Sequence, residues 1–243
     1  MKRMHAFMLS LAITVLLFSD IHFIKNLTNR REHIIERVVD GDTIVLENNE
    51  VLRLANINSP EKSEPSSIQA IDFLKSFENH PVDVESLGRD KYKRTLARIY
   101  SPDYLNLELV KKGFAKKFLV DEKELKIFAE AESQAINNQK GIWQFSPDKL
   151  CIKVSVNPKE EIVQLSNFCN LNLANWHIED ESRKQFFFPK ISSPLIKIHS
   201  LEGKNNKTDL YWNSKQDIWN NDRDSLYLFD SQNKLAGYYV YGY

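Results

Sequence analysis

The chain has no excess of charge of either sign, because its 243 residues contain 33 Lys and Arg against 33 Asp and Glu. This balance excludes the whole-protein positive field with which strongly basic proteins concentrate nucleic acid. Affinity for a polyanion must therefore come from local clusters. One candidate cluster contains Arg89, Lys91, Lys93, Arg94 and Arg98 against the single acid Asp90. A second contains Lys111, Lys112, Lys116 and Lys117, which is also typical of an ordinary solvated lysine face.

Cysteine is scarce, with only Cys151 and Cys169 in the whole chain. Two cysteines without a nearby pair of histidines argue against a structural zinc site. Both flank a predicted hairpin centred near residues 158–161, whose antiparallel strands can bring them opposite each other. In an oxidising compartment a disulfide between Cys151 and Cys169 is favoured, and we expect it.

The sequence also lacks an apolar run long enough for a full membrane span. Residues 6–18 are almost continuously apolar and follow Lys2 and Arg3, but a span needs about 20 residues. The run extends to residue 24 only across Asp20 and His22, and neither a small-x-small cleavage site nor a lipobox cysteine accompanies it. We therefore expect residues 1–30 to be a signal peptide or an uncleaved signal-anchor with a linker. A cleaved signal peptide would make the protein secreted, and a signal-anchor would hold it in the membrane through residues 6–24. In both cases we expect the protein on the extracytoplasmic side.

The most informative motif is present at residues 38–61, VVDGDTIVLENNEVLRLANINSPE. Asp40-Gly41-Asp42 is typical of a tight turn, and two β-branched, apolar runs follow it as a predicted strand pair. This hairpin carries Asp42 towards Asn58 and Glu61, and hard oxygen ligands gathered in this way suit Ca²⁺. Arg53 lies between apolar neighbours and is expected to point inward, where its planar guanidinium suits a phosphate. The plainer alternative is a simple hairpin turn with a surface arginine.

This motif and three later segments resemble the staphylococcal (thermo)nuclease family over roughly residues 34–144. The segments are RDKYKRTLARIY (89–100), LNLELVKKGFAKKF (105–118) and AEAESQAINNQKGIW (129–143). The resemblance implies a five-stranded OB-fold β-barrel with three helices, an α+β domain, over residues 31–145. Predicted strands cover 34–39, 43–46, 51–57, 82–87 and 95–100. Predicted helices cover 67–77, part of 105–118, and a segment opened by a capping pair at Asp121 and Glu124 and ended near Gly141.

The resemblance also implies roles for individual side chains. It makes Asp42, Asn58 and the Ser59 carbonyl the ligands of a Ca²⁺ cofactor. It gives Glu61 the positioning or activation of the attacking water, and Arg53 and Arg94 the scissile phosphate. Lys91 and Tyr92 resemble contacts to a neighbouring phosphate, although Tyr92 also fits a plain packing role.

Two departures from the family pattern bear on affinity. Asn58 stands where the family often has Asp, so one ligand charge is missing and Ca²⁺ is expected to bind more weakly. The positions of the family's base-stacking tyrosines align with Leu119 and Asp121, while Phe118 is nearby but out of register. Because stacking contributes about 1–3 kcal/mol per base, substrate affinity or base preference is expected to be reduced.

The function that these residues imply is a Ca²⁺-dependent nuclease, hydrolysing phosphodiester bonds of DNA and RNA with little sequence specificity. By family resemblance it would leave 3′-phosphate ends. The alternative is a catalytically degenerate OB-fold module that binds nucleic acid or a surface. The nuclease hypothesis is favoured, because the chain retains Asp42, Arg53, Glu61 and Arg94 together and binding alone does not require that set.

Residues 146–243 are predicted to form a second domain, an all-β immunoglobulin-like sandwich. Short predicted strands cover 152–156, 162–168, 176–179, 185–188, 196–199, 209–212, 225–230 and 235–241. NLANWHIEDESRKQFFFP and the region from DLYWNSKQDIW to the final tyrosine resemble a lamin-tail domain. That resemblance implies a binding or tethering module whose ligand the sequence does not identify. We expect the whole protein to be a monomer.

Overall fold

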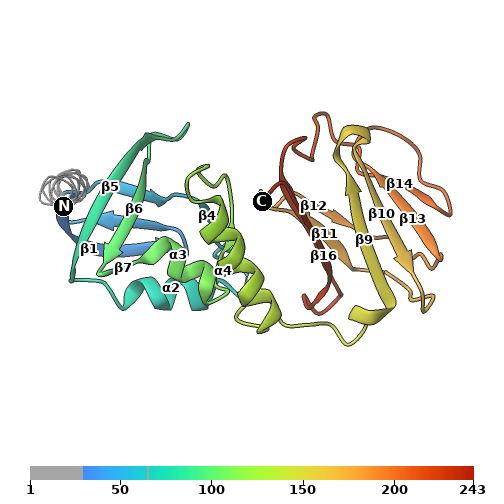
Figure 1. Cartoon of the computed structure of the whole chain (residues 1–243), viewed down its shortest axis with the longest axis horizontal. Coiled ribbons are helices and arrows are strands. Elements are labelled where there is room, and N and C mark those ends of the chain that lie inside the picture. The colour runs from blue at the N-terminus through green and yellow to red at the C-terminus, as the bar shows by residue number, and fades with distance from the viewer. Residues whose placement is uncertain (1–29, 65) are drawn as a thin grey trace, which may run out of the picture.

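The computed structural model describes residues 30–64 and 66–243, which form two β-rich regions side by side (Figure 1). The predicted targeting segment, with its anchoring run at residues 6–24, lies outside the described residues apart from Arg30. Within the described part of the chain, no helix combines the length and apolarity needed to cross a membrane.

The N-terminal region is a closed five-stranded barrel, as predicted. Its strands are β1 (Arg30–Asp40), β2 (Thr43–Leu46), β3 (Val51–Leu54), β5 (Pro81–Arg89) and β6 (Thr95–Ser101). They pair in the order β3-β2-β1-β5-β6, and a parallel pairing of β3 with β6 closes the ring. The single strand predicted over 51–57 is interrupted, because Asn56 adopts a left-handed conformation with φ 66° before the short strand β4 (Ile57–Asn58). This break positions Asn58 and Ser59 for the site.

Three helices pack on the barrel: α2 (Ser67–Lys75), α3 (Leu105–Lys111) and α4 (Leu125–Asn137). Two short strands complete the region, β7 (Asp103–Tyr104) beside β6 and β8 (Lys116–Lys117) beside β4. A continuous apolar core joins the barrel interior to the helices, with Leu52, Leu74 and Phe128 fully buried. The barrel thus gives the loops at β4 and β6 a rigid base.

The predicted capping pair at the start of α4 is wrong. Glu124 occupies the N-cap position but caps nothing with its side chain. Its carboxylate instead accepts hydrogen bonds from Arg98 Nε at 2.9 Å and from Asn56 Nδ2. The reason is that the mostly buried Arg98 needs charged partners, which Glu124 and Glu85 provide. Arg98 is consequently a structural residue and does not belong to the predicted basic cluster.

The C-terminal region contains two four-stranded sheets that enclose a second apolar core. One sheet has the order β14-β13-β10-β9 and the other β12-β11-β15-β16. The strands are β9 (Ile152–Asn157), β10 (Ile162–Asn167), β11 (His177–Asp180), β12 (Gln185–Phe187), β13 (Leu195–His199), β14 (Asp209–Tyr211), β15 (Asp224–Phe229) and β16 (Leu235–Tyr241). Short 3₁₀ turns at Lys149–Cys151 and Pro158–Glu160 precede β9 and β10. Its immunoglobulin-like, lamin-tail identity stays a prediction.

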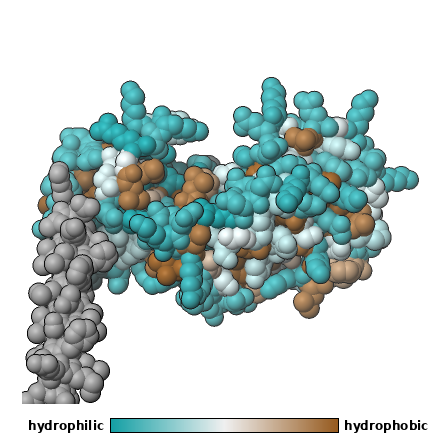
Figure 2. All heavy atoms as spheres, turned by 45° about the horizontal axis from the view of Figure 1, so that its top comes forward, coloured by the Kyte–Doolittle hydropathy of each residue, from teal (hydrophilic) through white to brown (hydrophobic). Residues whose placement is uncertain are grey.

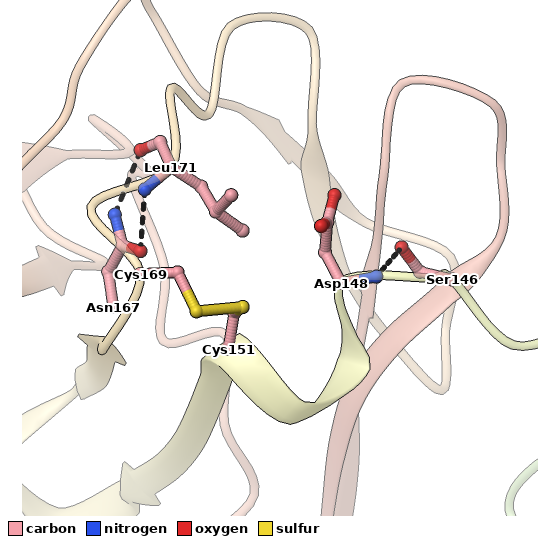
Figure 3. Close-up of a disulfide and its surroundings, with 6 residues drawn as sticks. All are labelled: Ser146, Asp148, Cys151, Asn167, Cys169 and Leu171. Carbon is pink, nitrogen blue, oxygen red and sulfur yellow. Dashed lines mark hydrogen bonds between the residues drawn. A yellow bond between two sulfur atoms is a disulfide. The ribbon is translucent and has the colours of Figure 1, made fainter.

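A disulfide joins Cys151 and Cys169 at the base of the β9–β10 hairpin (Figure 3). The two Cα atoms lie 5.2 Å apart. Backbone hydrogen bonding of Phe168 N to Cys151 O at 2.8 Å continues the pairing of the two segments beyond the strands. The bond therefore ties the chain entering the C-terminal region to the far end of its first hairpin.

The two regions share a buried interface. One apolar cluster joins Ala135, Ile136 and Trp143, at the end of the N-terminal region, to Tyr227 and other residues of β15 and β16. The rings of Trp143 and Tyr227 lie 5.0 Å apart. Backbone hydrogen bonds of Leu235 to Gln144 and Ser146 extend the contact. Because apolar burial is the main stabilising term in such contacts, the regions form one packed unit.

The second predicted lysine cluster is partly wrong, because Lys116 and Lys117 are buried in this interface. Lys116 forms an ion pair with Glu179 at 2.7 Å, and Lys117 forms one with Glu132 at 2.8 Å. Strand β8 lies where β11 and β15 approach the barrel, so its lysines are neutralised by interface carboxylates and cannot meet a substrate.

Elsewhere, hydrophilic residues predominate on the face shown in Figure 2, with apolar residues in small separate groups.

Candidate active site

The structure brings all eight predicted site residues of the barrel to one cleft of about 860 Å³. They are Asp42, Arg53, Asn58, Ser59, Glu61, Lys91, Tyr92 and Arg94. They come from the β1–β2 turn, β3, the segment after β3, and the loop before β6. The barrel register explains this convergence, because Thr43 pairs with Arg53 across β2 and β3, and Arg53 pairs with Leu96 across β3 and β6.

The turn at residues 40–42 places the Asp42 carboxylate on the cleft wall. Asp42 N donates to Asp40 Oδ1 at 3.0 Å, which holds the turn closed. Gly41 is needed because a Cβ there would lie 2.7 Å from Ser59 Oγ. In return Asp42 Oδ2 accepts a hydrogen bond from Ser59 N at 2.9 Å. The turn at residues 40–42 and the backbone at Ser59 therefore hold each other in position.

Arg53 is buried, as its apolar neighbours predicted, and its guanidinium is held on several sides. It donates to the Leu54 and Ile57 carbonyls at 2.6 and 3.0 Å and pairs with Asp42 at 3.1 Å. Nη2 also donates to Asn58 Oδ1 at 3.0 Å. Burial lowers the pKa of Arg53 from its ordinary value, Asp42 opposes this, and the positive charges of Arg94 and Arg183 lower the pKa further. Several cationic groups therefore converge on one cleft, which favours an anionic ligand.

Asp90 holds the Arg94 guanidinium in a defined orientation. Its Nε and Nη2 both reach Asp90 Oδ2 at 2.8 Å, and Nη1 approaches Thr43 Oγ1 at 3.4 Å. Asp90 Oδ1 also accepts the Arg94 backbone N–H at 2.9 Å. A guanidinium held on one edge keeps N–H donors on its other edge for a ligand. The remaining exposure of its side chain, 30%, is compatible with that use.

Glu61 lies on the rim of the cleft with an exposed side chain. Its Oε1 pairs with Nη2 of Arg183 at 2.8 Å. Arg183 belongs to the turn between β11 and β12, so the C-terminal region contributes to the cleft. Arg183 Nη1 also donates to the carbonyl of Ser59. The proposed water-activating carboxylate and one proposed metal ligand thus share an arginine from the other region.

The proposed ligand set fits a hard cation in its chemistry, because the donors of Asp42, Asn58 and Ser59 are all oxygens. Asp40 lies beside them in the cleft. Burial raises the pKa of Asp40, and the neighbouring Asp42 charge raises it further. A bound cation would relieve that repulsion. Within residues 30–64 and 66–243, no group of three or more His, Cys, Asp and Glu residues is arranged to hold a metal ion.

Lys91 and Tyr92 are exposed neighbours that both line the cleft. Tyr92 is 68% exposed, which argues against a packing role. Its ring faces Lys91 Nζ at 5.0 Å and the Arg94 guanidinium at 5.5 Å. Phe118 and the exposed Leu119 also line the cleft. The cleft wall thus contains the aromatic side chain of Phe118, although Phe118 is out of register with the family's stacking tyrosines.

Sequence reasoning missed Arg183. It lies 124 positions from Ser59 along the chain, between the strands predicted at 176–179 and 185–188. The sequence signals the turn but carries no signal that it docks on the barrel. Asp40 was read only as a turn residue, although its place in the Asp-Gly-Asp motif identifies it as a neighbour of Asp42.

Comparisons with known proteins find relatives of the barrel part of this chain. The family described as Staphylococcal nuclease homologue matches residues 51–145. The chain is 34% identical over 137 residues to Endonuclease YhcR of Bacillus subtilis (strain 168), covering 46% of this chain but only 11% of that longer protein. It is 31% identical over 116 residues to an uncharacterized endonuclease of Escherichia coli O157:H7, covering 44% of this chain and 73% of the relative. It is 30% identical over 130 residues to the Thermonuclease of Staphylococcus hyicus, covering 47% and 77%.

Proposed function

Because this chain belongs to the family of staphylococcal nuclease homologues, we propose that it is a Ca²⁺-dependent phosphodiesterase. The proposed substrates are DNA and RNA, cut with little sequence specificity. The observation that carries the proposal is the convergence of Arg53, Glu61 and Arg94 with Asp42 in one cleft. Pure binding does not need a carboxylate in the same cleft as two anchored guanidinium groups, whereas hydrolysis can use it as a base and the guanidinium groups as preorganised donors.

Each residue has a role that follows from its position. Arg53 and Arg94 bind the phosphodiester and stabilise the negative charge that increases in the transition state. Glu61, on the rim, orients or activates the attacking water. Asp42, Asn58 and the Ser59 carbonyl would hold Ca²⁺, which supplies positive charge at the non-bridging oxygens. Lys91 and Tyr92 contact a neighbouring phosphate and its nucleotide.

The test is cleavage of plasmid DNA and of single-stranded RNA, with Ca²⁺ and with a chelator. Wild type is expected to cleave only with Ca²⁺, and Glu61→Ala is expected to lose about 10²–10⁴ in rate. Lack of cleavage by wild type in Ca²⁺ would reject the nuclease proposal and leave the alternative, a catalytically degenerate binding module. Under that alternative the protein binds an oligonucleotide but releases no cleavage product.

We also propose an extracytoplasmic site of action. The support is the basic start and apolar run of residues 1–30 in the sequence, together with the Cys151–Cys169 disulfide, since such bonds persist in oxidising compartments. Sequencing the N-terminus of the mature protein distinguishes a cleaved signal peptide from an anchor. The C-terminal region is proposed to be a lamin-tail-like tethering module in a monomeric protein.

A further inference from the structure

The turn between β11 and β12 holds Arg183 in a fixed position. Asp180, which is 2% exposed, accepts hydrogen bonds from Lys184 N at 2.7 Å and Ser182 Oγ at 2.6 Å. Arg183 N donates to Asp180 O at 3.1 Å, and Arg183 itself has φ 70°. A buried carboxylate that braces its own turn leaves little freedom to the residues between. The arginine therefore projects from a rigid support.

Two further contacts fasten this turn to the barrel. Asn58 Nδ2 donates to the backbone carbonyl of Glu181 at 3.2 Å. Lys116 pairs with Glu179 at the end of β11, in a place where both side chains are under 10% exposed. An isolated surface ion pair contributes little to stability. In the Arg183–Glu61 pair the Glu61 side chain is 63% exposed, so what the buried contacts determine is the position of Arg183.

Asn58 and Arg183 are linked by this docking. An Asp at position 58 would set a carboxylate oxygen against the Glu181 carbonyl, and two acceptors cannot form a hydrogen bond. The Asn amide removes that conflict and lets the turn approach. The residue that departs from the family pattern is thus the one that receives the turn carrying Arg183.

We propose that Arg183 is a positioning residue of the active site, a fixed cation that the C-terminal region supplies in cis. It orients the Glu61 carboxylate and shares the Ser59 carbonyl with the proposed metal position. This inference rests on the proposed nuclease function. The C-terminal region is then part of the catalytic unit in addition to any tethering role.

Two measurable effects follow. Removal of the guanidinium leaves Glu61 without its orienting partner, and misplacement of a reacting group by about 1 Å costs about 10²-fold in rate. Removal also deletes a positive charge beside the metal ligands. Ca²⁺ then binds more tightly, by roughly three- to tenfold, because like charges a few ångströms apart repel even in a polar environment. A merely structural arginine would not improve Ca²⁺ affinity.

The experiment compares Arg183→Gln with Arg223→Gln in the full chain. Arg223 is a matched control because it also crosses the interface with a guanidinium, donating to Val120 O at 3.1 Å, but it does not line the cleft. Measurements are kcat and KM in saturating Ca²⁺, and Ca²⁺ affinity by titration calorimetry. Arg183→Gln is expected to lower kcat about 10- to 100-fold with little change in KM, and to bind Ca²⁺ more tightly. Arg223→Gln is expected to change neither.

Two further variants sharpen the result. Adding Arg183→Gln to Glu61→Ala is expected to cause no additional loss of rate, because the arginine acts through Glu61. Arg183→Lys keeps the charge and loses the planar fork, so it should retain weak Ca²⁺ binding with a reduced kcat. It serves as the readout if the Gln variant does not fold.

Equal behaviour of Arg183→Gln and Arg223→Gln in both measurements, with an active wild type, overturns the inference alone. An inactive wild type overturns the proposed function. In that case the Ca²⁺ titration decides: tighter binding by Arg183→Gln supports the fixed-cation role. Equal affinity of the variants, or no binding by any of them, rejects it.

Discussion

The Asn58 side chain joins the two halves of this protein. Its Oδ1 accepts from Arg53 in the cleft at 3.0 Å, while its Nδ2 donates to the Glu181 carbonyl across the interface at 3.2 Å. Position 58 therefore serves both the proposed metal site and the docking of the C-terminal region. The amide offers an acceptor to one partner and a donor to the other, which an ionised carboxylate cannot do.

Asn58→Asp should separate these two roles. The added charge is expected to tighten Ca²⁺ binding several-fold, and loss of the hydrogen bond to Glu181 is expected to lower stability without Ca²⁺ by about 1–3 kcal/mol. Calorimetric titration and denaturant unfolding measure the two effects. Asn58→Ala is the control, because it loses the same interface hydrogen bond without gaining charge. An unchanged Ca²⁺ titration for Asn58→Asp would reject the ligand assignment.

Arg94→Ala is expected to lower kcat about 10²–10³-fold, the usual effect of losing one preorganised donor to the transition state. Lys93→Ala, at the exposed neighbouring position, should change the rate by less than about threefold, since this single surface charge is screened by salt. Initial rates of oligonucleotide cleavage in saturating Ca²⁺ give the comparison. Similar losses in both variants would mean that the loop acts only through general positive charge.

The disulfide should stabilise the C-terminal region by about 3 kcal/mol, because it closes a loop between cysteines 18 positions apart. Guanidinium unfolding of the oxidised and reduced protein measures this difference. Cys151→Ala/Cys169→Ala is the control and should be insensitive to reductant. The folded, unreduced protein should not react with a thiol-blocking reagent. Reaction of both thiols would contradict the pairing in this protein.

Stability is expected to fall as pH rises from about 4.5 to about 7, because of Glu181. Burial raises the pKa of this carboxyl to about 7, which Lys117 and a hydrogen bond from Tyr243 oppose while Asp224 and Glu132 add to it. The folded protein therefore binds a proton that the unfolded chain releases near pH 4.5. The stabilising contribution is complete below that pH and is lost as pH passes through about 7, amounting to at most roughly 3 kcal/mol.

Glu181→Gln should flatten this dependence. Denaturant unfolding at several pH values gives the slope for each protein. Part of the slope should survive in the variant, because burial also raises the pKa of Asp224, to about 6. An identical pH profile for Glu181→Gln and wild type would show that the carboxyl is ionised throughout this range in the folded protein.

The sequence by itself determined most of the secondary structure and the barrel half of the site. Period-two apolar patterns and turn residues act locally, so β2 was predicted with its observed bounds and the eight C-terminal strands to within about one residue at each end. Asp42 and Arg53 belong to one hairpin, and Asn58 follows it on β4, directly after the break at Asn56. For that reason a short motif was sufficient to bring these residues together.

Only the tertiary structure decided which charges are free and which are engaged. Arg98, Lys116 and Lys117 look like substrate-facing cations in the sequence, yet carboxylates from other segments neutralise them. Arg183 looks like an ordinary turn residue, yet docking of the C-terminal region carries it to Glu61. Such pairings depend on how separate surfaces pack, and a linear pattern does not encode which distant residue a side chain will meet.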